Sequence, residues 1–177
     1  MHATRRSVDG ARHRRRVIGA VAAVGLLLGA TWRADAADRK NYPATMCVQP
    51  GASRTVQYDN SGRVINQSAS SVSLICPIVR DHSDEKWSHI VVRVVDRSSG
   101  AGNVVCQTRR IRATDGASAI VETQQTTGFS DAIQSLGFST EPGSVGILDT
   151  YVLTCSLPPN NGNGPSSILS YGVEEND

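Results

Sequence analysis

The sequence predicts an all-β fold, namely a single-domain antiparallel β-sandwich or jelly roll with about eight to nine strands and two disulfides. Three observations predict it. Apolar and polar residues alternate through most of the chain, turns rich in Gly, Asn and Asp separate the alternating segments, and four cysteines follow residue 36. No segment has the spacing of an amphipathic helix except one ambiguous stretch, residues 129–138.

The first 36 residues differ from the rest and have the composition of a secretory signal peptide. Six arginines precede an apolar run from Val17 to Ala30, and the sequence Ala34-Asp35-Ala36 follows it. A basic start, a short apolar run and an A-x-A site are typical of a cleaved leader. The run is shorter than the roughly 18 residues of a membrane span. We therefore expect residues 1–36 to be removed and residues 37–177 to form a periplasmic or secreted domain.

Strands can be located in chain order from their alternation. Residues 55–58 and 63–67 flank Asp59-Asn-Ser-Gly62, which is typical of a hairpin loop. Residues 119–125 form a weaker strand, and the polar run 123–127 fits the solvent face of an edge strand. The strongest segments each place a row of side chains on one inward face. They are 71–79 with Val72, Leu74 and Cys76; 87–96 with Ile90, Val92 and Val94; 103–112 with Val104, Cys106 and Thr108; 151–157 with Tyr151, Leu153 and Cys155; and 167–175 with Leu169, Tyr171 and Val173.

Residues 129–138 fit two structures. Ser130 could cap a short helix that Gly137 ends, while Leu136 and Phe138 alternate as they would in a strand. The surrounding β structure favours the strand.

Four cysteines remain after the leader, and an even number in an exported chain indicates two disulfides. Zinc sites need close pairs such as C-x-x-C, whereas the separations here are 29, 30 and 49 residues. Three pairings are open. Strand placement favours Cys47–Cys76, which ties the segment before the first predicted strand to a core strand, and Cys106–Cys155, whose members lie mid-strand on inward faces.

The net charge argues against one class of partner. The first 36 residues hold seven of the chain's 18 Lys and Arg and two of its 16 Asp and Glu, which leaves 11 basic and 14 acidic residues in the rest. A mildly acidic domain without a basic stripe is a poor match for nucleic acid. We expect neither nucleic acid nor, after leader removal, a membrane as a partner.

Several short motifs are spread over nearly all of residues 37–177. They are Gly62-x-Val64-x-Asn66, Ile75-Cys-Pro-Ile78, Val94-x-Asp96, Val105-Cys106, Tyr151-x-Leu-x-Cys-x-Leu-Pro158, Ser167-Ile168 and Tyr171-x-Val-x-Glu175. This layout resembles a group of uncharacterised exported bacterial proteins with four cysteines. The resemblance implies the domain limits and no activity, since the group has no known function.

Trp87 and Arg93 are the candidate ligand-binding residues. Strand phase places Trp87, the only Trp after residue 36, on the Arg93 face rather than the Ile90 face. An exposed aromatic ring there would form a platform on which a sugar ring stacks. The alternative is that Trp87 closes one end of the core.

Residues 81–89 form the densest polar cluster. Asp81, His82 and Asp84 carry the ligand types of a metal site, but their spacing does not match a calcium loop. A loop between strands is ordinarily polar because its backbone needs water. We therefore expect a solvated loop, with no metal and no cofactor.

The sequence favours an exported non-catalytic domain that binds a glycan or a protein surface. No G-x-S-x-G elbow and no H-E-x-x-H helix is present, so no catalytic residue is assigned. The alternative is a small hydrolase that uses the acidic, His-containing loop at residues 81–89.

Overall fold

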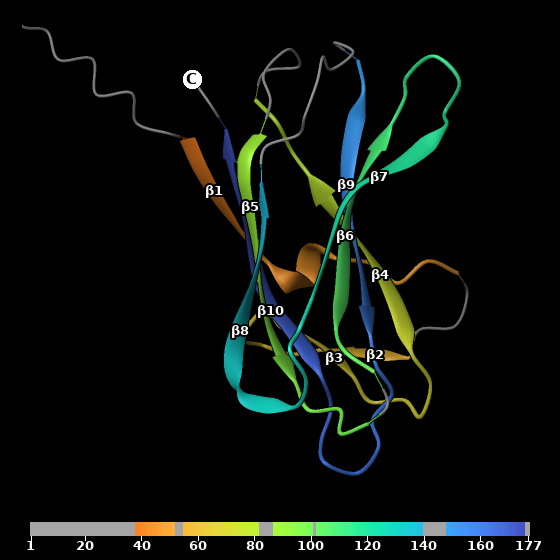
Figure 1. The fold of residues 1–177 in the computed structure, drawn as a ribbon, viewed down its shortest axis with the longest axis vertical. Coiled ribbons are helices and arrows are strands. Elements are labelled where there is room, and N and C mark those ends of the chain that lie inside the picture. Colours follow the sequence, from red (N-terminus) through yellow and green to blue (C-terminus); the bar gives the residue numbers. More distant parts are fainter. Residues whose placement is uncertain (1–37, 52–54, 82–86, 101, 140–147, 176–177) are drawn as a thin grey trace, which may run out of the picture. The chain divides into compact units, whose positions relative to one another are not determined.

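The computed structural model describes residues 38–51, 55–81, 87–100, 102–139 and 148–175, which form ten strands and one short 3-10 helix (Figure 1). The elements in chain order are β1 (Asp38–Pro43), η1 (Ala44–Met46), β2 (Val56–Tyr58), β3 (Val64–Asn66), β4 (Val72–Ile78), β5 (Trp87–Asp96), β6 (Val105–Ile111), β7 (Ser118–Gln125), β8 (Ser130–Ser139), β9 (Thr150–Leu157) and β10 (Ser167–Glu175). Within these ranges no helix is long and apolar enough to span a membrane. The predicted leader lies outside the described residues.

Two antiparallel sheets make up the fold (Figure 1). Sheet A has the order β2-β3-β10-β5-β8, and β1 shares one edge of β10 with β3. Sheet B has the order β4-β9-β6-β7. The inward faces of both sheets contribute to one core, as alternation with period two requires. The predicted all-β sandwich with two disulfides is confirmed.

The two disulfides join Cys47 to Cys76 and Cys106 to Cys155, the pairing that strand placement favours. Cys106 and Cys155 are directly opposite each other on the neighbouring strands β6 and β9. Cys47 follows η1 and ties this segment to the middle of β4. Two such bonds are typical of proteins that fold in an oxidising compartment.

The ambiguous segment 129–138 is a strand from Ser130 onward, as the surrounding β structure favours, because β8 pairs with β5 at residues 134–139 and at Ser130. The strand β1 was not expected from the sequence. Its residues, Asp-Arg-Lys-Asn-Tyr-Pro, show no apolar alternation, and β1 is held instead by its pairing with β10. The ring of Tyr42 stacks on Tyr171 of β10 with centroids 5.1 Å apart.

Bulges change the predicted phase at two places. Leu169 has no partner in the β10–β5 ladder, so Ile168 is fully buried and Leu169 is only half-buried, which corrects the expected inward row. In β5 the ladder passes from Trp87 to His89, so Ser88 is the extra residue. This second bulge decides the position of Trp87.

Candidate functional site

The outer face of sheet B presents regular rows of side chains on three neighbouring strands. These residues alternate with the buried ones of β4, β9 and β6, so they point away from the core. The rows, each crossing β4, β9 and β6, are Ser73, Ser156 and Val105; Ile75, Thr154 and Gln107; and Pro77, Val152 and Arg109.

Residues 48–50 add a wall beside β4. Val48 forms an isolated antiparallel bridge with Ile75, in which both backbone hydrogen bonds measure 2.8 Å. The adjacent Cys47–Cys76 disulfide fixes the segment to β4. Pro50 therefore stands at the edge of the sheet B face.

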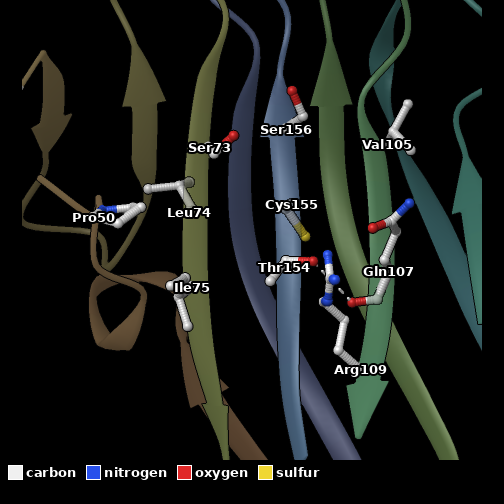
Figure 2. Close-up of a pocket in the computed structure, with 10 residues that line it drawn as sticks. All are labelled: Pro50, Ser73, Leu74, Ile75, Val105, Gln107, Arg109, Thr154, Cys155 and Ser156. Atoms are coloured by element: carbon white, nitrogen blue, oxygen red, sulfur yellow. Dashed lines mark hydrogen bonds between the residues drawn. The ribbon is translucent and has the colours of Figure 1, made fainter. Parts of the chain in front are cut away.

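The rows and the wall enclose a groove of about 320 Å³, called here the sheet B groove (Figure 2). This volume is at the lower end of the range of ligand pockets, roughly 300–1,000 Å³. Ten residues line the groove: Pro50, Ser73, Leu74, Ile75, Val105, Gln107, Arg109, Thr154, Cys155 and Ser156.

The lining groups combine hydrogen-bonding and apolar surfaces. Three hydroxyls, one amide and one guanidinium lie among the side chains of a proline, an isoleucine and a valine. Hydroxyl and amide groups both donate and accept hydrogen bonds, whereas the guanidinium only donates. Such a set suits a ligand that carries many hydroxyl groups on a partly apolar frame.

Arg109 is held in a defined position. Its Nε donates a hydrogen bond of 3.1 Å to the Ser118 hydroxyl of the neighbouring strand β7. Figure 2 shows its guanidinium extending along the sheet toward Thr154 and Gln107. The Thr154 hydroxyl donates to the backbone carbonyl of Gln107 at 3.4 Å, which links β9 to β6 on this face.

The floor of the groove is rigid. Cys106 and Cys155 lie on its inner side, almost completely buried, and their disulfide ties β6 to β9 between the rows that contain Ser156 and Thr154. Polar groups mounted on fixed strands keep their spacing better than groups on loops.

Trp87 does not form the exposed platform considered from the sequence, because it is fully buried in the core. The bulge at Ser88 reverses the phase of the first residues of β5, so Trp87 points inward although His89 and Arg93 point outward. Trp87 closes one end of the core, which was the alternative. Arg93 is exposed on the outer face of sheet A, on the sheet that does not carry the groove.

Of the candidate metal ligands, only Asp81 is among the described residues, and His82 and Asp84 lie outside them. The carboxylate of Asp81 forms an ion pair of 2.9 Å with Lys40, which also contacts the buried Glu175 at 3.2 Å. Desolvation opposes the charge of Lys40, but its hydrogen bonds to Asp81 and Glu175 outweigh this and raise the pKa of Lys40. Asp81 thus serves in a structural ion cluster. No His, Cys, Asp and Glu side chains group as a metal site within the part described.

Three other described carboxylates, candidates for a two-carboxylate site, are engaged at separate places. Glu122 accepts hydrogen bonds from the backbone and hydroxyl of Ser139, and Asp131 pairs with Arg97 at 2.8 Å. Asp149 pairs with Arg110 at 2.5 Å beside a second hollow. None of these acids lines the sheet B groove.

The groove residues were not singled out from the sequence. The predicted phase of residues 103–112 and 151–157 already places Gln107, Arg109 and Thr154 outward. The signal that identifies them is the lateral register of the strands, because only the pairing of β9 with β6 brings Thr154 opposite Gln107 and places Arg109 in the next row.

No family model and no curated protein matches this chain. Solved structures of similar fold do. A low-affinity xylan-binding module from Roseburia intestinalis has 13% identity and a TM-score of 0.47, and the match covers 78% of this chain and 96% of that one. A second xylan-binding module has 14% identity and a TM-score of 0.48 over 78% and 96% of the two chains. A family 35 carbohydrate-binding module from Clostridium thermocellum has 11% identity and a TM-score of 0.45 over 77% and 98%. Similarity this distant identifies no ligand for this chain.

Proposed function

We propose that residues 37–177 form an exported, non-catalytic domain that binds a glycan in the sheet B groove. One observation carries the proposal. Hydroxyl, amide and guanidinium groups from three neighbouring strands converge in a single groove over a disulfide-fixed floor.

The groups of the groove match the chemistry of a sugar. Glycan hydroxyls pair with Thr154, Ser156 and Gln107, and the C–H faces of a sugar ring pack on Ile75 and Val105. No aromatic ring stands among the lining residues, so hydrogen bonds of about 0.5–1.5 kcal/mol each supply most of the affinity. We expect dissociation constants between about 1 μM and 1 mM, which correspond to about −8 to −4 kcal/mol.

Export is part of the proposal, and it rests on the composition of residues 1–36 and on the two disulfides. N-terminal sequencing of the protein recovered outside the cytoplasm should begin within a few residues of Ala37. An intact Met1 on the recovered protein would contradict cleavage.

The binding proposal is tested with an array of neutral and acidic oligosaccharides, followed by calorimetric titration of the best ligand. Thr154→Val and Ser156→Ala each remove one groove hydroxyl and should weaken binding by about 3- to 10-fold. Ser135→Ala is the matched control, because Ser135 is an exposed strand residue opposite Arg93 in sheet A. Absence of binding to every glycan, or equal effects of the three substitutions, would overturn the proposal.

A further inference from the structure

We infer that the ligand of the sheet B groove is an anionic glycan and that Arg109 binds its charged group. This inference rests on the proposed function and adds the chemical class of the ligand. It starts from the charges of the groove: among its lining residues Arg109 is the only charged one.

The neighbours of Arg109 on the same stretch of chain are paired with acids. Arg110 pairs with Asp149 at 2.5 Å, and Arg112 pairs with Asp115 at 2.9 Å. Arg109 instead donates to a neutral hydroxyl, that of Ser118, and no carboxylate within the described residues pairs with it. Acidic side chains thus neutralise Arg110 and Arg112, whereas the charge of Arg109 remains available to a ligand in the groove.

The acid of β7 that lies beside Arg109 in the β6–β7 ladder, Glu122, forms its hydrogen bonds with other residues. Glu122 lies opposite Thr108, next to Arg109, but its carboxylate accepts hydrogen bonds from Ser139 at 2.9 Å and from Gln124 at 2.6 Å. Because of the bulge between these ladder pairs, Ile120 lies opposite Arg109. The groove therefore offers a cation with no acid beside it.

The orientation of Arg109 suits an anionic group. With Nε held by Ser118, the terminal nitrogens of the guanidinium extend toward Thr154 and Gln107 (Figure 2). A guanidinium is a planar fork that binds a carboxylate or a sulfate or phosphate ester with two parallel hydrogen bonds, and one that is already positioned loses less entropy on binding. Hydroxyl groups beside the fork would bind the sugar hydroxyls next to the charged substituent.

The probe ligands separate charge from sugar. We would titrate the folded domain with an oligogalacturonate, with its methyl-esterified form, and with a sulfated oligosaccharide of similar length. The free acid should bind about 10- to 100-fold more tightly than its ester, because a hydrogen bond to a charged group is stronger than one between neutral groups. Tighter binding of the sulfated sugar than of the acid would support an anionic glycan and identify sulfate as the group.

Variants of two arginines assign the preference to a residue. Arg109→Gln should abolish the difference between acid and ester while the ester still binds, and Arg109→Lys should restore only part of it. Arg93→Gln is the matched control, since Arg93 is a mid-strand arginine on the outer face of the other sheet. Thermal unfolding of each variant verifies that the domain remains folded.

Failure of this inference and of the proposed function give different results. Equal binding of the acid and its ester, with both weakened by Thr154→Val, would overturn the anionic preference and leave the glycan site standing. A preference for the acid that Arg93→Gln removes and Arg109→Gln does not would overturn the assignment to Arg109. Absence of binding to all three probes and to the wider array would overturn the proposed function itself.

Discussion

Tyr171 connects the two sheets through a single side chain. It belongs to β10 in sheet A, and its hydroxyl donates a hydrogen bond of 2.8 Å to the backbone carbonyl of Pro77 on β4 in sheet B. Burial raises the pKa of Tyr171 to about 12, and the neighbouring Tyr42 adds to the shift. The folded protein therefore keeps this hydroxyl neutral at a pH at which an ordinary tyrosine ionises.

This shift predicts an alkaline loss of stability. In the unfolded chain Tyr171 ionises near pH 10, whereas in the folded chain it ionises near pH 12. The contribution of neutral Tyr171 is fully present below pH 10 and is lost as the pH rises from about 10 to about 12. Tyr171→Phe should remove the last step of a tyrosinate absorbance titration and lower the free energy of unfolding at neutral pH by about 0.5–1.5 kcal/mol.

Tyr58→Phe is the control for this titration. Tyr58 is exposed, although its hydroxyl also donates to a backbone carbonyl, that of Cys47. Tyr58→Phe should leave the last step of the tyrosinate titration in place. A late step that survives Tyr171→Phe would show that another tyrosine carries the raised pKa.

Trp87 marks the limit of what alternation determines for a single residue. The alternation of β5 predicts that Ile90, Val92 and Val94 point inward, and all three side chains are fully buried in the structure. One extra residue, Ser88, reverses the direction of the Trp87 side chain that precedes it. A bulge depends on the register with the partner strand β10, and a single sequence does not contain that register.

Among the elements, β6 and β9 are the pair on which the groove depends, and the Cys106–Cys155 disulfide closes a chain separation of 49 residues between them. Replacing both cysteines by alanine should lower the free energy of unfolding by about 4 kcal/mol, because the unfolded chain regains its freedom. The same variant should weaken glycan binding, because the rows that contain Thr154 and Ser156 lose the covalent link between β6 and β9 that lies beneath them. Urea unfolding and calorimetric titration measure the two effects.

Removal of the Cys47–Cys76 disulfide is the comparison. The Cys47–Cys76 disulfide closes a chain separation of 29 residues, so its loss should lower the free energy of unfolding slightly less, by about 3–4 kcal/mol. It should loosen the wall at residues 48–50 rather than the floor of the groove. Unchanged binding after loss of Cys106–Cys155 would show that the β6–β9 ladder alone holds the groove.

The elements differ in how well the sequence predicts them. Strands with one buried face, such as β4, β5 and β9, are visible because burial imposes alternation. The strand β1 is visible only in the structure, because its stability comes from pairing with β10 and from contacts such as Lys40 with Glu175. Its polar composition carries no periodic signal.

For the whole molecule, the alternation predicts two packed sheets but not which outer face carries the groove. That choice depends on lateral pairing across strands far apart in the chain. Val48, Ile75, Thr154, Gln107 and Thr123 occupy successive positions of one row, which crosses the 48–50 segment, β4, β9, β6 and β7. Cys47–Cys76 and Cys106–Cys155 each fix part of this row.

The row predicts how glycan affinity depends on ligand length. Neighbouring strands lie about 4.8 Å apart, so four steps across the row span about 19 Å. One β-linked sugar unit lengthens a glycan chain by a distance similar to the spacing between two neighbouring strands. Each added unit should therefore meet the next strand of the row. Affinity should rise with each sugar and level off at about four to five units. Calorimetric titration with oligosaccharides of increasing length measures the trend.

Thr123→Ala, at the far end of the row, should weaken binding of long ligands and leave that of disaccharides unchanged. An affinity that is already maximal for a disaccharide would show that the ligand lies within the sheet B groove alone and does not extend to β7.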